Sequence, residues 1–362
     1  MEIKGSIKKI QYDIKLAGTL EVIEWSDFEI NDIPTACLIS DGQTTFAISK
    51  WVSPKRTRSY PYERVYNTLN ISKKITVIPI VKDEGAAGDR DFIQWDTVSL
   101  MSLLDVYVIF AYYEKAESKG NKITNQKFDN DYILSKIDSI SKFHSSALHW
   151  NLNELDVHFD DLLEKVKLNY AIIQQQTAIK LHNINGINRL QKKIDRDVEK
   201  FKTFSRGKAL EAQKREFRTL QPKEVLSTAT KAKIIITNYL GGQYYFTVDE
   251  IEIQDEIVYL KEGKHTKSNL LPSKSDIKDG LLKMILYSNI ENVEIENKIY
   301  FIQSVLELTS SLLRGQIDST KTDKEKNAFF HLNKFSETQI QFIKTLFEEA
   351  VINNFKVVIK QI

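Results

Sequence analysis

Cysteine is nearly absent from this chain: Cys37 is the single example among 362 residues. One cysteine cannot form an intramolecular disulfide, and it cannot supply the several thiolates of a cysteine-rich zinc site. Cysteine usage of this kind is typical of a reducing compartment. We therefore expect a cytoplasmic protein that does not depend on disulfides.

Long apolar runs are missing as well. No stretch reaches the roughly 18 uncharged apolar residues of a membrane-spanning helix, and the opening MEIKGSIKK has no apolar signal core. The formal net charge is only +2, so the charge of the whole chain favours no class of partner. These features predict a soluble protein with no membrane partner.

Several common catalytic motifs are also absent. There is no Gly-x-x-x-x-Gly-Lys-Ser/Thr loop and no Gly-x-Ser-x-Gly elbow, so the sequence gives no support for nucleotide hydrolysis or serine hydrolase chemistry. The histidines do not occur at the His-x-x-x-His spacing of zinc proteases. They are His144, His149, His158, His182, His265 and His331.

The chain does contain enough apolar sequence for two or three folding units, since 42% of its residues are hydrophobic. We expect an α/β (α+β) protein with an N-terminal mixed unit (1–154), a helical bridge (155–204) and a C-terminal unit (205–362). Asn185-Gly186 is expected to break the helical stretch. Apolar and β-branched runs predict N-terminal strands at 20–25, 36–39, 45–51, 75–81 and 106–113.

The C-terminal part contains its own boundary signals. The polar segment 318–327 is expected to be a loop or linker, and Ser336-Glu-Thr-Gln339 is a capping-box pattern that predicts the start of a helix. A terminal strand is expected over 355–362. The helix carries an apolar stripe for which core packing is favoured over a dimer surface: Ile340, Ile343, Phe347 and Val351.

Residues 244–265 carry the most informative pattern. Two strand-like runs, YYFTVDEIEI and IVYLKEGKH, flank the polar tripeptide Gln254-Asp-Glu, which predicts a β-hairpin. A turn near Gln254–Asp255 would place Asp249 opposite Lys261 and next to Glu262. Glu262 and Lys264 are two residues apart, so they project from the same face of their strand.

Two carboxylates and an ammonium group at one point on a sheet suit phosphoryl chemistry with a metal. Mg²⁺ is held by one or two carboxylates together with water and substrate phosphate, and it polarises a phosphoryl oxygen and lowers the pKa of a bound water. Lys264 would orient the attacking water and offset the charge on phosphorus. The sequence thus predicts Asp249 and Glu262 as Mg²⁺ ligands, with Lys264 as the catalytic lysine.

The spacing alone is a weak signal, because 28% of the residues are charged. Glu117-Ser-Lys119 and Glu296-Asn-Lys298 show similar patterns. The hairpin differs in its surroundings: the apolar run Ile257–Leu260 predicts a buried strand that ends in the charged residues, and a helix is predicted over Asp276–Tyr287. A strand pair, a charged triad and then a packing helix is the order that a metal-dependent nuclease core uses.

The segments Tyr259–His265 (YLKEGKH) and Asp276–Met284 (DIKDGLLKM) resemble the PD-(D/E)xK nuclease superfamily and its type II restriction endonuclease branch. The resemblance covers roughly residues 205–310. It implies a central mixed sheet flanked by helices, Asp249 and Glu262 as metal ligands, the Gly263 carbonyl as a third ligand and Lys264 as the catalytic residue. The chain has Val248 where the motif of the superfamily has proline.

Many members of this superfamily also carry an acidic residue on the helix before the first strand. Glu211, in Arg206-Gly-Lys-Ala-Leu-Glu211, is the candidate for this role, and Glu216 is its rival. An ordinary solvated helix residue is the alternative interpretation of each. On the resemblance, Glu211 is grouped with the expected catalytic residues.

The most basic run of the chain, Lys50–Arg64, interleaves aromatic residues with lysine and arginine. Such a loop suits phosphate neutralisation and contacts between arginine and guanine edges. A solvated loop is the alternative. The residues expected to bind DNA, here and after the catalytic lysine, are Lys50, Lys55, Arg56, Arg58, His265 and Lys267.

A second unusual segment, Lys82–Asp96, is rich in glycine and acidic residues but lacks the alternating oxygen ligands of a calcium-binding EF-hand. A second nuclease centre with Glu117 and Lys119 is one interpretation. A structural loop with Asp–Arg pairs, which braces the recognition surface, is the favoured one.

The sequence therefore predicts a type II restriction endonuclease, a Mg²⁺-dependent enzyme that hydrolyses phosphodiester bonds of double-stranded DNA at a specific sequence. A homodimer is expected, because a two-fold enzyme suits a palindrome. The resemblance also implies a cognate DNA methyltransferase encoded nearby. Two alternatives stay open: a non-catalytic DNA-binding or effector protein with a degenerate nuclease fold, and a defence or repair nuclease without sequence specificity.

Overall fold

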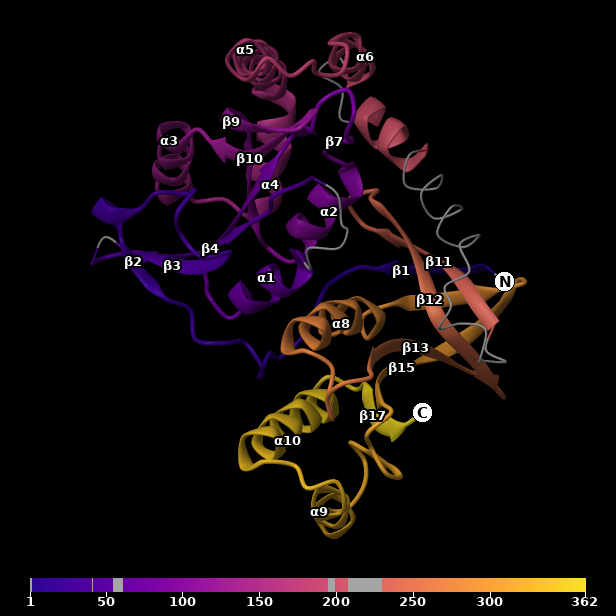
Figure 1. Ribbon diagram of the computed structural model, residues 1–362. Coiled ribbons are helices and arrows are strands. Elements are labelled where there is room, and N and C mark those ends of the chain that lie inside the picture. Colours follow the sequence, from indigo (N-terminus) through magenta and orange to yellow (C-terminus); the bar gives the residue numbers. More distant parts are fainter. Residues whose placement is uncertain (1, 41, 55–60, 195–198, 208–229) are drawn as a thin grey trace. The chain divides into compact units, whose positions relative to one another are not determined.

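The computed structural model describes residues 2–40, 42–54, 61–194, 199–207 and 230–362. The chain forms two units, one of residues 19–208 and one that joins Met1–Gly18 to Ala209–Ile362 (Figure 1). Both units mix helices and strands, which confirms the predicted α+β class. None of the helices in the described ranges is long and apolar enough to cross a membrane.

The unit of residues 19–208 is built on a five-stranded sheet in the order β2-β3-β4-β5-β8. β4, β5 and β8 run parallel, and β3 is antiparallel to β4. Every residue of β8 is buried, as expected of a parallel strand whose two faces are covered. The strands are β2 (Val22–Glu24), β3 (Ala36–Ser40), β4 (Thr45–Lys50), β5 (Lys74–Pro79) and β8 (Tyr107–Ala111).

Two short two-stranded sheets and several helices complete this unit. The strands are β6 (Val81–Asp83) with β7 (Arg90–Phe92), and β9 (Tyr113–Lys119) with β10 (Lys122–Phe128). The helices with defined bounds are α1 (Pro61–Thr68), α2 (Trp95–Leu103), α3 (Asn130–Ser141), α4 (Ala147–Val157), α5 (Phe159–Thr177) and α6 (Asn185–Ile194).

The segment predicted as a separate bridge, 155–204, belongs to this unit. α4 packs against β8, and α5 packs against β9. α5 buries an apolar stripe in this packing that includes Leu163, Val166 and Ile173. The expected break also falls elsewhere. α5 ends at Ala178, which has a φ of 56°, whereas Asn185-Gly186 begins α6.

The second unit is built on an eight-stranded sheet in the order β13-β12-β11-β1-β14-β15-β17-β16. β13 also pairs with β15 in parallel, so the strands from β13 through β1 to β15 form a closed circuit of paired neighbours. The strands are β1 (Glu2–Ile7), β11 (Thr230–Asn238), β12 (Gln243–Gln254), β13 (Ile257–Thr266), β14 (Glu291–Ile295), β15 (Lys298–Ser310), β16 (Gln316–Asp318) and β17 (Lys356–Gln361).

The N-terminal segment is an integral part of this sheet. β1 lies between β11 and β14, and its Ile3 and Ile7 are buried. The predicted units 1–154, 155–204 and 205–362 therefore differ from the structure, in which residues 19–208 form one unit and residues 1–18 belong to the other. The first residues were placed with the unit that follows them in sequence, whereas strand pairing joins them to residues more than 200 positions away.

Within the described residues of this unit, the second sheet is accompanied by α8 (Lys274–Tyr287), α9 (Asp323–Leu332) and α10 (Glu337–Ile352). The expected loop at 318–327 is partly helical, because Thr322 and Glu325 form a capping box at the start of α9. The capping box predicted at the start of α10 is confirmed.

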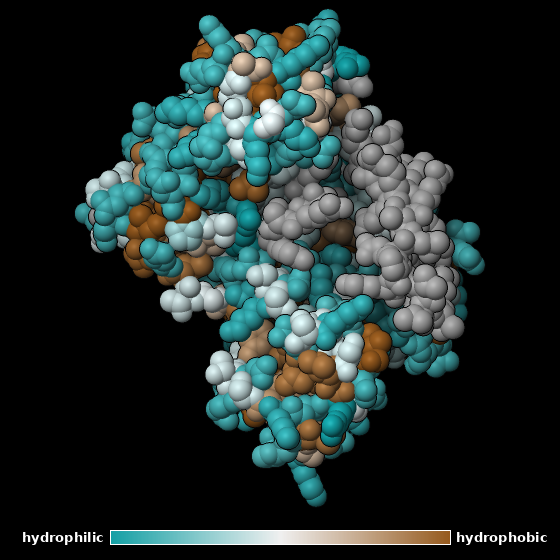
Figure 2. Space-filling model, in the orientation of Figure 1, coloured by the Kyte–Doolittle hydropathy of each residue, from teal (hydrophilic) through white to brown (hydrophobic). Residues whose placement is uncertain are grey.

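The apolar stripe predicted for α10 is only partly buried. Ile343 and Phe347 lie in the core, whereas Val351 is 59% exposed. Exposed Ile352 and Leu332 add apolar surface on α10 and α9. Figure 2 shows such hydrophobic surface among hydrophilic atoms over the part of the chain that contains these helices.

Glu349, buried on α10, holds the N-terminal segment against that helix. Its Oε2 accepts hydrogen bonds from the backbone N–H groups of Lys15 and Leu16, each at 2.8 Å, and its Oε1 accepts one from the Tyr12 hydroxyl at 2.8 Å. We expect Glu349→Ala to lower the free energy of unfolding by about 3 kcal/mol, since three hydrogen bonds to a buried, charged acceptor are lost.

Urea denaturation of the full chain tests this expectation. Glu348→Ala is the matched control, because Glu348 is the exposed neighbour on the same helix, and its effect should stay within about 0.5 kcal/mol. Equal effects of the two substitutions would contradict the role assigned to Glu349.

Candidate functional site

The predicted hairpin is formed by β12 and β13, with a register that differs from the expected one by one residue. Gln254 pairs with Ile257, and Glu250 pairs with Lys261. Asp255 has a φ of 54°, as a tight two-residue turn requires. Continued by one step, this register places Asp249 opposite Glu262. The correction brings the two carboxylates onto one face, because directly opposed residues share a face of the sheet.

Glu262 is a buried carboxylate at the end of an apolar strand face. Val258 and Leu260 on the same face are fully buried, and Glu262 itself is 1% exposed. The chain then passes through α8 before it reaches β15, which is parallel to β13. Such a crossover lays its helix over the sheet, and α8 contacts both strands. α8 thus covers the residues at the end of β13 (Figure 1).

Two lysines neutralise Glu262. The Nζ of Lys283, on α8, lies 2.8 Å from Oε1 and 2.9 Å from Oε2 of Glu262. The Nζ of Lys264 lies 3.0 Å from Oε1 of Glu262, and it donates to Oδ2 of Asp279 at 3.0 Å. These four residues form one ionic network between β13 and α8, which we call the Glu262 network.

The charges of this network are mutually dependent. Burial alone would raise the pKa of Glu262, but the positive charges of Lys283 and Lys264 outweigh it and lower that pKa. Burial would likewise lower the pKa of Lys283 and Lys264, but the charge of Glu262 raises both values above those of an ordinary lysine. All three groups are therefore held in their charged forms.

Asp249 faces a different environment at the solvent-exposed edge of the network. Its Oδ2 accepts a hydrogen bond from the backbone N–H of Gly263 at 2.9 Å. The surrounding protein atoms, and secondly the charge of Glu262, raise the pKa of Asp249 to about 6. Two carboxylates with opposite pKa shifts thus lie side by side, and a cation between them would relieve the repulsion.

The donor set fits a hard divalent cation. Three carboxylates face two ammonium groups, since Asp249 joins the Glu262 network, and one negative charge is left for a cation to offset. Asp249 and Glu262 would hold the ion, and Mg²⁺ needs only one or two carboxylates because it retains several waters. The described residues contain no cluster of three or more His, Cys, Asp or Glu able to hold a metal, so water and substrate oxygens would complete the coordination.

Gly280 lets the side chain of Lys264 pass beneath α8. A Cβ at this position would lie 2.8 Å from Cδ1 of Leu306 and 3.2 Å from Cε of Lys264. By contrast, a Cβ at Gly263 would lie 3.6 Å from Oδ2 of Asp249, an ordinary contact. The absence of a side chain is therefore a steric requirement at Gly280 but not at Gly263.

The opposite face of the hairpin carries a separate charged group. Lys261 contacts Glu250 at 2.6 Å and Glu252 at 2.9 Å. His265 follows Lys264 directly, so the two side chains project from opposite faces of β13. Nδ1 of His265 lies 3.0 Å from Oγ1 of Thr309 on β15. This placement separates His265 from the Glu262 network and does not support the expected phosphate contact beside Lys264.

The expected DNA-binding residues have different outcomes. Lys50 is buried, and its ammonium donates to the carbonyls of Ile30 at 2.6 Å and Ile33 at 2.9 Å, so the side chain stabilises a loop instead of facing a phosphate. Lys267 is exposed. The remaining residues of the basic run, Lys55, Arg56 and Arg58, lie outside the described residues, as do Glu211 and Glu216.

The acidic and glycine-containing segment 82–96 is organised around Asp83. Oδ1 of this buried carboxylate accepts from the N–H of Gly85 and lies 2.8 Å from Nδ1 of His182, while Nη1 of Arg90 lies 3.8 Å from Oδ2. An Asp–Arg pair was predicted for this segment. Gly85 and Arg90 lie within the segment and His182 lies outside it, so Asp83 holds the segment together and anchors it to the unit, which favours the predicted structural loop.

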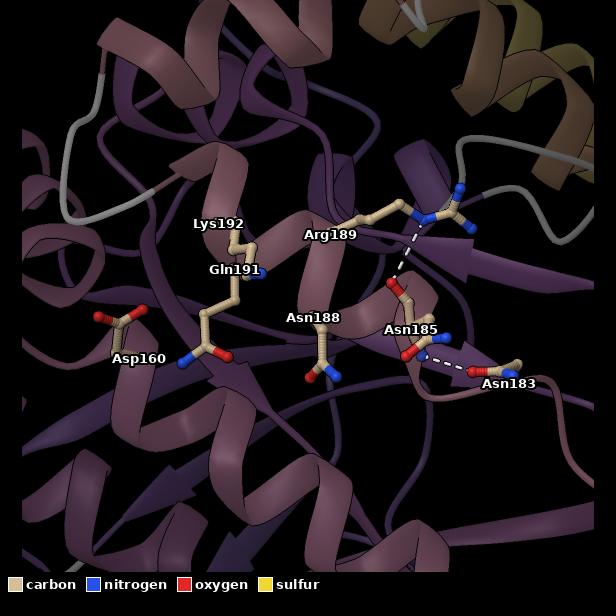
Figure 3. Close-up of a pocket in the computed structure, with 7 residues that line it drawn as sticks. All are labelled: Asp160, Asn183, Asn185, Asn188, Arg189, Gln191 and Lys192. Carbon is tan, nitrogen blue, oxygen red and sulfur yellow. Dashed lines mark hydrogen bonds between the residues drawn. The ribbon is translucent and has the colours of Figure 1, made fainter.

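A polar hollow of about 830 Å³ lies beside α6 in the same unit (Figure 3). Gln191, in its wall, accepts from Lys167 and donates to Glu164, both on α5. Nε of Arg189 donates to the Asn185 carbonyl. These contacts tie α6 to α5 and to its own first turn.

Sequence reasoning missed Asp279 and Lys283, although both lie in the segment DIKDGLLKM. The available signal was their spacing. Residues four apart lie on one side of a helix, and here that side also carries Gly280 and Tyr287, both buried. A lysine and an acid beside a buried helical face indicate ionic partners in the opposing sheet.

We expect Gly280→Ala to destabilise the protein by about 1–3 kcal/mol, because the new methyl group overpacks against Leu306 and Lys264. The higher helix propensity of alanine would offset about 1 kcal/mol of this loss. Gly263→Ala is the matched control and should be tolerated. Chemical denaturation of both variants measures the difference, and a larger loss for Gly263→Ala would contradict the steric argument.

We expect Asp249→Asn to stabilise the protein above pH 6. The pKa of Asp249 rises from 3.8 to about 6 on folding, so ionisation costs stability above pH 6, and this cost disappears as the pH falls below 3.8. The gain should be about 1 kcal/mol, less than the full shift implies, because Asp249 is exposed and water screens its charge. Denaturation at pH 7.5 and at pH 4 measures it, with Glu256→Gln at the turn as the control. A gain that is greater at pH 4 would refute the assigned shift.

Comparisons with family models, with curated proteins and with solved structures returned no match for this chain. The resemblance noted in the sequence therefore depends on the motif residues alone.

Proposed function

We propose that this protein is a Mg²⁺-dependent nuclease of the PD-(D/E)xK type that hydrolyses phosphodiester bonds of double-stranded DNA at a specific sequence, as type II restriction endonucleases do. One observation carries the proposal: Lys264 contacts Glu262 at 3.0 Å, in a hairpin register that sets Asp249 opposite Glu262. The order of elements also supports it: the β12–β13 hairpin is followed by α8, and after the short strand β14 the chain returns as β15, parallel to β13.

Each residue has a defined part in the proposed reaction. Asp249 and Glu262 would hold the Mg²⁺ ion, which supplies Lewis-acid activation of the phosphate and of a water when bound. Lys264 keeps its ammonium charge, is held by Glu262 and Asp279, and would donate to the attacking water or to a phosphoryl oxygen. The water oxygen bonds to phosphorus, and the bond from phosphorus to the leaving oxygen breaks.

The partners follow from this chemistry. Double-stranded DNA is the proposed substrate, with exposed Lys267 as a phosphate contact. A homodimer would place two sites on the two antiparallel strands of a palindrome. A cytoplasmic enzyme of this type would act beside a cognate DNA methyltransferase encoded nearby.

A non-catalytic DNA-binding protein is the second candidate, and one contact favours it. Both oxygens of Glu262 are already engaged by Lys283, so the network is neutralised at its centre without any metal. A defence or repair nuclease without sequence specificity is the third candidate, and the fragment pattern separates it from the first.

The test is incubation of the purified chain with unmethylated phage DNA, in Mg²⁺ and in EDTA, followed by electrophoresis. Discrete fragments that require Mg²⁺ are expected. A smear would favour the non-specific nuclease, and a retained gel shift without cleavage in either condition would favour the DNA-binding protein.

Lys264→Ala and Asp249→Ala should each lower the cleavage rate by at least about 100-fold while DNA binding in a gel shift survives. Lys261→Ala is the matched control, because Lys261 also lies on β13 and pairs with two carboxylates, but on the opposite face. Cleavage at the wild-type rate by the Lys264 or the Asp249 variant would disprove the assigned site.

A further inference from the structure

Lys283 takes no part in the residue roles derived above, yet it makes the closest contacts to Glu262. Its Nζ spans both carboxylate oxygens, at 2.8 and 2.9 Å, whereas Lys264 reaches only one of them at 3.0 Å. The side chain of Glu262 is 2% exposed and that of Lys283 is 20% exposed. The lysine thus approaches the carboxylate from α8 and retains some access to water.

A buried carboxylate without a cation is strongly destabilising, so an acid intended for a metal needs another partner whenever the metal is absent. Lys264 alone leaves Oε2 of Glu262 without one of these ionic contacts, because its Nζ is shared between Oε1 and Asp279. Lys283 supplies the missing charge and a bond to each oxygen. A divalent cation that binds Glu262 therefore meets a position that already carries positive charge.

We propose that Lys283 is a positioning residue that acts as the resident counter-cation of Glu262 and competes with the divalent metal for that carboxylate. This inference rests on the proposed metal-dependent function. Lys283 keeps Glu262 ionised and oriented in the metal-free protein, and its flexible side chain withdraws along α8 when the ion binds. The protein can therefore fold without metal, but it binds the metal more weakly because the ion must displace Lys283.

The consequence has a definite sign. Replacement of Lys283 by methionine keeps an unbranched side chain one atom shorter but removes one positive charge and two hydrogen bonds. The metal-free protein should become less stable, and the cation should bind more tightly because it no longer displaces the lysine. Since charge-assisted hydrogen bonds are among the strongest in proteins, we expect an increase in affinity of about tenfold or more.

The experiment is calorimetric titration of the full chain with Mn²⁺ and with Ca²⁺, together with thermal denaturation with and without each ion. Lys283→Met should bind the ion about tenfold more tightly than the wild type, and the ion should raise its midpoint temperature by a larger increment. Lys283→Arg, which keeps the charge, should bind like the wild type. Lys261→Met is the control on the opposite face and should also match the wild type.

The outcomes separate the two proposals. If the wild type binds neither ion, the metal-dependent function and this inference both fail. If the wild type binds but Lys283→Met binds equally or more weakly, the inference fails and the proposed function stands. A purely structural lysine would lower the midpoint equally with and without metal. If Lys283→Met does not fold, Lys283→Gln replaces it, and unchanged affinity in that variant would equally overturn the inference.

Discussion

The buried carboxylate of Glu262 is the constraint on which the candidate site depends. Its position at the end of an apolar strand face removes it from water, and a charge in that environment requires cations within hydrogen-bond distance. Lys264 from the same strand and Lys283 from α8 meet this requirement. The carboxylate therefore fixes the position of Lys264 and also links α8 to the sheet through Lys283.

The same constraint explains the division of labour between the two acids. Glu262 is held ionised by its lysines, whereas Asp249 lies at the exposed edge with a raised pKa. The Glu262 carboxylate is held in place as an anion by its lysines, whereas the Asp249 carboxylate takes up a proton more readily than an ordinary aspartate. This pairing is familiar from sites where titratable groups have pKa values pushed apart by their environments. It distinguishes the Glu262 network from the ion pairs of Lys261 on the opposite face, whose carboxylates are 32% and 45% exposed.

Local pattern was sufficient for several elements. The alternation on both sides of Gln254–Glu256 predicted the hairpin, and the capping residues Ser336 and Gln339 predicted the start of α10. The register was predicted one residue away from the observed one. A turn signal spread over three polar residues does not specify which of them adopts the positive φ, which the structure assigns to Asp255. That single step decides whether Asp249 faces Lys261 or Glu262.

The sequence by itself determined the α+β class, the hairpin and the shared strand face of Glu262 and Lys264, because strand periodicity and turn chemistry act over a few residues. Only the tertiary structure decided that β1 joins the distant β11, that Lys50 turns inward, and that Asp279 and Lys283 meet Lys264 and Glu262. Strand pairing between remote segments and helix packing depend on contacts that no local window contains. The partners of a buried charge are known only when the fold has brought them together.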